Sequence, residues 1–285
     1  MEIKSVGVVG CGLMGSGIAQ VCAQAGYQVV VREINGQFLK AGLGKIEKTL
    51  GGAVTKGKMA EAEMQAILDR VKGTTTLQDF GGCDLVIEAA IENLDEKKKV
   101  FAELDAVCPP HAILSSNTSS IPIIAMAAAT KRPEQFLGLH FFNPVQVMKL
   151  LEIIRTIKTS EETIATARAF SDKIGKQSIL AKDRAGFIVN LLLIPYLLEA
   201  IRAYEMGLAT VEDIDNGMML GCAHPMGPLT LLDFVGLDTT YYIANIMFDE
   251  FKDPKYAAPP LLKQMVTAGY LGKKSGRGFY DYTKG

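Results

Sequence analysis

Histidines and paired cysteines are scarce in this chain of 285 residues. It has three histidines and five cysteines, and no two cysteines form a CxxC pair. An odd number of scattered cysteines argues against a disulfide framework and against a zinc site, and it fits a reducing compartment. We therefore expect no metal centre, and we expect a cytoplasmic protein.

An excess of one charge and long apolar runs are also missing. The formal net charge is -1, which does not suggest a surface for nucleic acid or for an anionic membrane. The most apolar stretch, residues 187–201, is interrupted by Asn190 and Glu199 and is too short to span a bilayer. Residues 3–9 already predict a strand, so no signal peptide is expected. We expect neither a nucleic-acid partner nor a membrane segment.

The first half of the chain alternates short β-branched runs with helical patterns. Continuous apolar strands separated by helices indicate a parallel sheet with both faces covered. Beyond about residue 186 the patterns are helical, with helices starting near 186, 211 and 228 and a last strand signal only at 279–280. The expected strands cover 3–9, 28–31, 71–75, 85–89, 113–116, 137–141 and 149–154, and the expected helices cover 15–25, 35–67 with a break near Gly51-Gly52, 94–107 and a segment from 121.

This change of pattern predicts two domains of an α/β protein. Residues 1–184 are expected to form a Rossmann-type, doubly wound and mostly parallel sheet, with a helical hairpin inserted at about 35–68. Residues 185–285 are expected to form an all-helical domain. Its apolar residues lie on several faces, which makes a role in self-association plausible.

A glycine-rich turn, Gly10-Cys11-Gly12-Leu13-Met14-Gly15, lies between the first predicted strand and the first predicted helix. In this context the GxGxxG spacing is typical of dinucleotide binding, because the glycines allow a tight turn, the approach of a pyrophosphate and close helix packing. Glu33 ends the second strand, where a carboxylate bonds ribose hydroxyls and repels a 2′-phosphate. This favours NAD over NADP, although Arg32 beside it could accept that phosphate. The alternative is a tight turn without a ligand.

His140 is the candidate general base. Hydride transfer from an alcohol requires a base, and histidine suits this role near neutral pH. His140 ends an apolar strand, at the edge of the sheet where open α/β proteins bind ligands. Glu152 lies in the next apolar run, where a carboxylate is costly to bury unless it is paired. If the two strands are neighbours, Glu152 orients the imidazole and stabilises its cation. The alternatives are a structural histidine and a surface glutamate on an edge strand.

Two further polar features of the sequence each have a structural and a functional interpretation. The run Ser-Ser-Asn-Thr-Ser-Ser at 115–120 follows a strand and opens a helix, so its hydroxyls could cap that helix or face the ligand crevice. Asn190 lies in an otherwise apolar helix, where a buried amide needs partners. It therefore makes either a structural hydrogen bond or a substrate contact.

Six segments, taken together and in order, form a specific pattern: the glycine turn at 10–15, EAAIEN at 88–93 with Lys97, SNTSS at 116–120, HFFNP at 140–144 with Glu152, GFIVN at 186–190 and KKSGRGFY at 273–280. In these segments the chain resembles the (S)-3-hydroxyacyl-CoA dehydrogenases, and in length and detail the stand-alone 3-hydroxybutyryl-CoA dehydrogenases. The resemblance extends over essentially the whole chain.

The resemblance implies an oxidoreductase that interconverts (S)-3-hydroxybutyryl-CoA, or another short-chain 3-hydroxyacyl-CoA, and acetoacetyl-CoA with NAD. It implies that His140 is the catalytic base with Glu152 as its orienting partner. Ser119 and Asn190 would contact the substrate's oxygen and the reacting groups, and Thr49 and Lys56 would contact CoA. It also implies a homodimer through the C-terminal helical domain, which closes over the substrate. The implied cofactor-binding residues are Gly10, Cys11, Gly12, Leu13, Met14, Gly15, Glu33, Ala90, Glu92, Lys97, Asn117, Ser119, Asn143 and Lys274.

The chain departs from the usual family pattern at three positions. Glu33 stands where aspartate is usual, and Ala185 and Leu191 stand where proline and arginine are frequent. Two other functions stay open: a dehydrogenase of a free hydroxy or sugar acid on the same scaffold, and a non-catalytic NAD-binding or structural protein. Lysines of the helical hairpin discriminate between the two substrate classes, because only a CoA ester has phosphates for them to bind.

Overall fold

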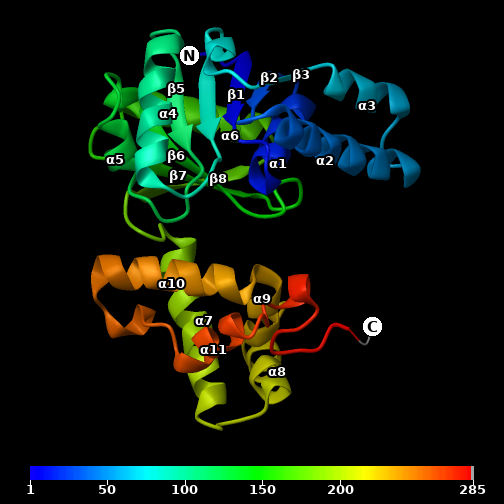
Figure 1. Ribbon diagram of the computed structural model, residues 1–285, viewed down its shortest axis with the longest axis vertical. Helices are drawn as coiled ribbons and strands as arrows, with labels where there is room; N and C mark the ends of the chain where they lie inside the picture. Colours follow the sequence, from blue (N-terminus) through cyan, green and yellow to red (C-terminus); the bar gives the residue numbers. More distant parts are fainter. Residues whose placement is uncertain (284–285) are drawn as a thin grey trace. The chain divides into compact units, whose positions relative to one another are not determined.

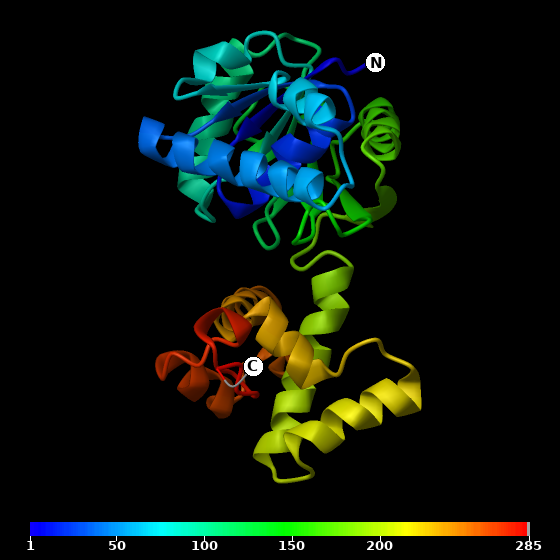
Figure 2. The same cartoon turned by 90° about the vertical axis from the view of Figure 1, so that its right-hand side faces the viewer.

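The computed structural model describes residues 1–283, and the chain divides into two compact units, Met1–Arg184 and Ala185–Gly285. The first unit is a sheet with helices packed on it, and the second is helical in its described part (Figure 1 and Figure 2). The predicted fold class is therefore confirmed.

An eight-stranded sheet forms the centre of the first unit, in the order β3-β2-β1-β4-β5-β6-β7-β8. Neighbouring strands are parallel except β6 and β7, which are antiparallel. Because β1 lies between β2 and β4, the strand order reverses there, and such a switch point is where open α/β sheets bind ligands. The strands are β1 Ser5–Val9, β2 Gln28–Arg32, β3 Val71–Thr74, β4 Leu85–Glu88, β5 Ile113–Ser116, β6 Phe136–Phe141, β7 Leu150–Arg155 and β8 Gln177–Lys182.

The inner strands are mostly apolar because both of their faces are covered. Val6, Val8 and Val9 of β1 are completely buried, and β-branched side chains pack well on a pleated sheet. Polar residues interrupt this pattern at the carboxyl ends of two central strands, where Glu88 ends β4 and Ser116 ends β5. Both are completely buried, so this end of the sheet contains buried polar side chains, whereas the rest of these two strands is mainly apolar.

The helices of the first unit connect these strands, and two of them form a hairpin beside β2 and β3 that projects from the sheet in Figure 1. These two are α2 Gly36–Thr55 and α3 Glu61–Leu68. The hairpin contacts the glycine-rich turn through Gly42, where an added Cβ would lie 2.3 Å from the Cys11 carbonyl oxygen. The other helices are α1 Leu13–Gln24, α4 Leu94–Val107, α5 Ile123–Ala127 and α6 Glu161–Lys173, with short 3-10 turns at Leu77–Phe80 and Pro133–Gln135.

The helix break predicted near Gly51-Gly52 is wrong, because α2 continues through both glycines to Thr55. A glycine inside a helix costs about 1 kcal/mol relative to alanine, and burial of Ile46 and Leu50 on the same helix offsets that cost. The helix ends one turn later, where Gly57 adopts a φ of 65° and donates a hydrogen bond to the Val54 carbonyl at 2.9 Å.

The residues between 155 and 186 contain two elements that the sequence pattern did not indicate, α6 and β8. The strand β8 pairs only with β7 at the edge of the sheet, and its first and last residues are exposed. An edge strand with few fully buried residues has a weak hydrophobic period, which explains the omission.

The second unit is mainly helical in its described residues, around a core that includes Leu197, Leu232 and Leu262. Two isolated β-bridges join Arg277 to Gly272 and to Asp281. The strand signal at 279–280 is wrong: the backbone N–H groups of Phe279 and Tyr280 donate to the buried carboxylate of Asp233, at 2.9 Å each, instead of to a neighbouring strand. No helix within residues 1–283 is long and apolar enough to cross a membrane. The helices are α7 Val189–Glu205, α8 Val211–Cys222, α9 Pro228–Val235, α10 Leu237–Phe251 and α11 Pro260–Thr267, with 3-10 turns at Pro254–Tyr256 and Lys273–Ser275.

Candidate active site

The glycine-rich turn connects β1 to α1 and leaves the first backbone N–H groups of that helix available to a ligand. Gly10 adopts a φ of 97°, and a Cβ there would lie 2.6 Å from the Ala89 carbonyl oxygen. Gly12 is the N-cap of α1 and makes no side-chain capping bond, and the space around its Cα is open. Gly15 lies against Gly10, because a Cβ at position 15 would be 1.9 Å from the Gly10 carbonyl oxygen. Such an uncapped helix N-terminus suits a pyrophosphate.

Glu33 follows β2 and lies beside this turn. Its Oε1 accepts a hydrogen bond from the backbone N–H of Cys11 at 2.7 Å, and its Oε2 accepts one from the N–H of Ile34 at 3.0 Å. Burial and the neighbouring Glu33 carboxylate raise the pKa of the Cys11 thiol to about 11. A carboxylate fixed at the end of β2 fits the hydroxyls of an adenosine ribose.

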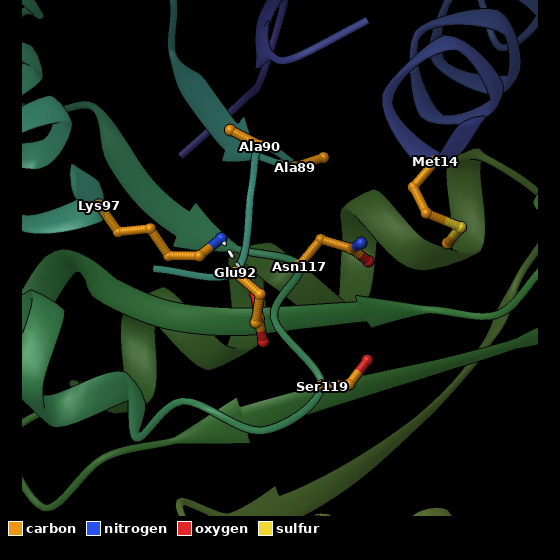
Figure 3. Close-up of a pocket in the computed structure, with 7 residues that line it drawn as sticks. All are labelled: Met14, Ala89, Ala90, Glu92, Lys97, Asn117 and Ser119. Carbon is orange, nitrogen blue, oxygen red and sulfur yellow. Dashed lines mark ion pairs between the residues drawn. The ribbon is translucent and has the colours of Figure 1, made fainter. Parts of the chain in front are cut away.

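A cavity of about 190 Å³ lies at the carboxyl ends of β4 and β5 (Figure 3). Six of the residues predicted for the cofactor site line it, together with Ala89, which was not predicted. The six come from α1, the β4–α4 loop, α4 and the turn after β5, and they are Met14, Ala90, Glu92, Lys97, Asn117 and Ser119.

A buried lysine occupies one wall of this cavity. The Lys97 side chain is 2% exposed, and its ammonium lies 3.3 Å from Glu92 Oε2, the pair joined by the dashed line in Figure 3. Its second partner is the carboxylate of Glu88, at 2.5 Å. Glu88 was not predicted as a site residue, although a lone acid at the end of an otherwise apolar strand is a signal that could have indicated it.

His140, Glu152 and Ser119 form a continuous hydrogen-bonded chain next to the cavity. The strand β6 is antiparallel to β7, and their register places His140 directly opposite Glu152. The Nδ1 of His140 lies 2.7 Å from Glu152 Oε2, and its Nε2 lies 2.9 Å from the hydroxyl oxygen of Ser119. His140 and Glu152 are both buried. The two strands are thus neighbours, as the dyad hypothesis required, and a buried carboxylate lies against one nitrogen of the imidazole.

The hairpin and the loop after β6 line a second cavity of about 210 Å³. Thr49 lines it, and so do Lys45 and Lys48, two of the hairpin lysines that were expected to suit the CoA phosphates on charge grounds. Asn143 also lines this cavity and not the first one. Lys56, in contrast, is the C-cap of α2 and does not line it.

Two predicted residues belong to the second unit. Asn190 lies in the first turn of α7 and is buried. Lys274 lies in the 3-10 turn Lys273–Ser275, and its ammonium donates to the carboxylate of Asp238 at 2.7 Å. No group of histidine, cysteine, aspartate and glutamate in residues 1–283 could ligate a metal ion.

A switch-point sheet, an uncapped glycine turn and an acid at the end of β2 define the dinucleotide-binding class of α/β proteins. Family models resolve the class further. The model for the 3-hydroxyacyl-CoA dehydrogenase NAD binding domain matches residues 5–184, and the model for the 3-hydroxyacyl-CoA dehydrogenase C-terminal domain matches residues 186–282. The chain belongs to the 3-hydroxyacyl-CoA dehydrogenase family, and its first unit is the family's NAD-binding domain.

Individual relatives match over nearly the full length. The chain is 54% identical over 282 residues to a 3-hydroxybutyryl-CoA dehydrogenase of Mycobacterium tuberculosis, covering 98% of this chain and 99% of the relative. The crystal structure of M. tuberculosis FadB2 matches with a TM-score of 0.97 and 53% identity, over 99% of this chain and 100% of that one. That of (S)-3-hydroxybutyryl-CoA dehydrogenase PaaH1 from Ralstonia eutropha matches with a TM-score of 0.94 and 45% identity, over 99% and 100% of the two chains.

Proposed function

We propose that this protein is an NAD-dependent oxidoreductase that interconverts (S)-3-hydroxybutyryl-CoA and acetoacetyl-CoA. The observation that supports this most directly is the series of hydrogen bonds from Ser119 through His140 to Glu152. Ser119 also lines the cavity at the carboxyl ends of strands in an NAD-binding domain. Relatives called 3-hydroxybutyryl-CoA dehydrogenase support the choice of substrate.

In the proposed reaction His140 manages the proton. During oxidation its Nε2 takes the proton of the substrate's C3 hydroxyl, and the resulting imidazolium is stabilised by the Glu152 carboxylate on Nδ1. NAD, when bound, supplies the acceptor for the hydride that leaves C3. During reduction His140 returns the proton to the oxygen of the C3 carbonyl. The Ser119 hydroxyl, already bonded to Nε2, positions that oxygen beside the base.

The remaining sites follow the same proposal. Met14, Ala90, Glu92, Lys97 and Asn117 would hold the nicotinamide half of the cofactor, and the glycine turn with Glu33 would hold its pyrophosphate and adenosine ribose. Thr49, with Lys45 and Lys48 on the same helix, would bind CoA phosphates, with Lys56 further along α2. Asn143, Asn190 and Lys274 are proposed to complete the binding of cofactor and substrate. The helical unit is proposed as the homodimer interface and as the part that covers the substrate.

The location of the protein in the cytoplasm remains a prediction. It is supported by the cysteines, since none of the five is in a disulfide and four of them are buried.

The test of the function is reduction of acetoacetyl-CoA by NADH, followed by absorbance of the reduced cofactor. His140→Gln should lower kcat/KM by about 10²- to 10⁴-fold, because the general base is lost. His111→Gln is the matched control, since His111 is exposed and bonds Asp84 just before β4, at the opposite end of that strand. Activity of His140→Gln within a few-fold of wild type would contradict the assignment.

A substrate panel separates the remaining substrate classes. It contains 3-ketoacyl-CoA esters of increasing length and free acetoacetate, each with NADH and with NADPH. The proposed function predicts the highest kcat/KM for the shortest CoA ester with NADH. Equal activity on free acetoacetate would favour a dehydrogenase of free acids.

A further inference from the structure

A charged cluster lies behind the wall of the first cavity, at the carboxyl end of β4. The Glu88 side chain is completely buried and does not line the cavity. Its Oε1 accepts hydrogen bonds from the Ala90 N–H at 2.7 Å and from the Lys97 ammonium at 2.5 Å, and its Oε2 accepts one from the Ser116 hydroxyl at 2.6 Å. One carboxylate therefore bonds the β4–α4 loop, helix α4 and the end of β5.

The cluster continues from Lys97 to the turn that holds Ser119. Glu92, the second partner of Lys97, accepts hydrogen bonds on Oε1 from the hydroxyls of Thr118 and Ser120, the latter at 2.8 Å. These two residues flank Ser119 on both sides. Ser116, at the start of the turn, is bonded to Glu88 directly. Glu88 is thus connected to both ends of the turn, once directly and once through Lys97 and Glu92.

The stability of the fold gives no reason for these buried charges. Removing two charges from water is expensive, and a well-packed apolar pair in place of a buried ion pair is often neutral or stabilising. Lys97 is nevertheless 2% exposed and Glu88 not at all, and the ammonium reaches a cavity wall. A buried pair that reaches a cavity wall suits a role in binding better than a role in folding.

We propose that Glu88 is a positioning residue of this site: it fixes the Lys97 ammonium in the cavity wall and fixes the Ser116–Ser120 turn against it. The inference rests on the proposed function, because the cavity must bind the cofactor. Without the Glu88 charge, Lys97 keeps only the more exposed Glu92, whose side chain is 24% accessible, and the ammonium loses its defined place.

The test compares Glu88→Gln, Lys97→Met and the double variant, with NADH affinity measured by fluorescence and stability measured by urea unfolding. Each single variant leaves a buried charge with fewer partners and lowers the unfolding midpoint, whereas the double variant restores it. Glu88→Gln should raise the Kd of NADH by about 10- to 100-fold, the range for a lost buried bond to a charged group. In the Lys97→Met background, Glu88→Gln should raise the Kd of NADH by less than about twofold more, because Glu88 acts through Lys97.

The matched control is Glu96→Gln. Glu96 lies on the same helix as Lys97 and also pairs with a lysine, Lys99 at 2.7 Å, but both side chains are exposed. Its Kd for NADH should equal that of wild type. Wild-type protein that does not bind NADH would overturn the proposed function. If the wild-type protein binds NADH, two results would overturn the positioning role alone. One is a Kd of Glu88→Gln within twofold of the wild-type Kd. The other is a rise in Kd of about 10- to 100-fold when Glu88→Gln is added to Lys97→Met.

A milder change decides the question if Glu88→Gln does not fold. Ser116→Ala keeps all three charges and removes the hydrogen bond from the Ser116 hydroxyl to Glu88, together with the bond that the hydroxyl oxygen accepts from the Thr118 N–H at 3.2 Å. We expect kcat with acetoacetyl-CoA to fall about three- to tenfold at saturating NADH, because Ser119 is less well placed. An unchanged kcat would overturn the role of Glu88 in fixing the turn.

Discussion

His140 and Glu152 lie directly opposite each other on the antiparallel strands β6 and β7, with His140 Nδ1 2.7 Å from Glu152 Oε2. The pairing register produces this contact, since a slip by one residue would turn Glu152 to the other face of the sheet. The loop between these two strands and the adjoining strand ends separate the two residues in sequence. The proposed base and its partner are therefore fixed by one local hairpin.

The first prediction concerns the acid of this pair. Glu152→Gln should lower kcat for acetoacetyl-CoA reduction by about 10²- to 10⁴-fold, because an amide neither stabilises the imidazolium nor fixes the imidazole tautomer. The Kd of NADH should stay within twofold of wild type, since Glu152 does not line the cofactor cavity. Glu161→Gln is the control, because Glu161 pairs with Arg155 at the end of β7 and is exposed. A kcat near that of the control would show that Glu152 is structural.

The second prediction concerns the choice of cofactor. Glu33→Ala should raise the ratio of kcat/KM with NADPH to that with NADH by about tenfold, because the carboxylate that repels a 2′-phosphate is gone and Arg32 remains. Glu47→Ala, an exposed acid on α2, should leave the ratio unchanged. Initial rates with both cofactors measure it. A constant ratio in Glu33→Ala would mean that another group excludes NADPH.

The third prediction concerns the CoA phosphates. The double variant Lys45→Ala/Lys48→Ala should raise KM for acetoacetyl-CoA by about tenfold at low salt with little change in kcat, because both lysines line the second cavity. The difference from wild type should shrink at high salt, since exposed charges are screened. Lys56→Ala should raise KM less, because Lys56 does not line that cavity. A larger effect of Lys56 would place the CoA phosphates at the end of α2 instead.

The fourth prediction is a loss of stability in alkali. Burial raises the pKa of the Cys11 and Cys83 thiols to about 11 and that of Cys108 to about 12, and it also raises the pKa of Cys22, from an ordinary value of 9.0 in each case. The folded chain therefore retains these protons above pH 9, where the unfolded chain releases them. The stabilisation is complete below pH 9 and is lost as the pH rises above it, up to about pH 11 for Cys11 and Cys83 and to higher pH for Cys108 and Cys22, at about 1.4 kcal/mol per pH unit for each thiol.

Urea unfolding at pH 8 and pH 10, with a reductant present, measures this loss. We expect the free energy of unfolding to fall by about 4–6 kcal/mol between the two values. Cys22→Ala should reduce the difference in unfolding free energy between pH 8 and pH 10 by about a quarter, the contribution of one of the four thiols. This holds whatever the substitution does to the stability at either pH. Equal stability at pH 8 and pH 10 would contradict the assignment of the buried thiols.

The sequence predicts those parts of the site that depend on local geometry. The Gly10–Gly15 turn could be recognised because strand, turn and helix are consecutive in the chain. Gly10 is required by its positive φ and Gly15 by its close approach to the Gly10 carbonyl oxygen. His140 and Glu152 could be paired because two apolar runs separated by a short loop are expected to be neighbours. The cavity then brought together Met14, Glu92, Lys97, Asn117 and Ser119, which the family resemblance had implied.

Other features depend on contacts between distant segments and left little signal in the pattern. Glu88 bonds Ser116, 28 residues away, and only the parallel pairing of β4 with β5 brings them together. The edge strand β8 is too exposed to show a clear period. The helix α2 continues through Gly51 and Gly52 because burial of Leu50 outweighs the low helix propensity of glycine. The predicted break at these glycines considered only that propensity. Lys45 and Lys48 line the second cavity because α2 lies beside the loop after β6, which is distant from α2 in the sequence.

The contact between Gly42 and Cys11 has a genetic consequence. A Cβ at position 42 would lie 2.3 Å from the Cys11 carbonyl oxygen and 2.4 Å from its sulfur, so even alanine would push the hairpin away from the glycine turn. The turn belongs to the proposed cofactor site and the hairpin to the proposed CoA site. A missense allele at this one codon would therefore impair the handling of both ligands together, and a smaller side chain at Cys11 would not suppress it, because the shortest approach is to the backbone carbonyl oxygen.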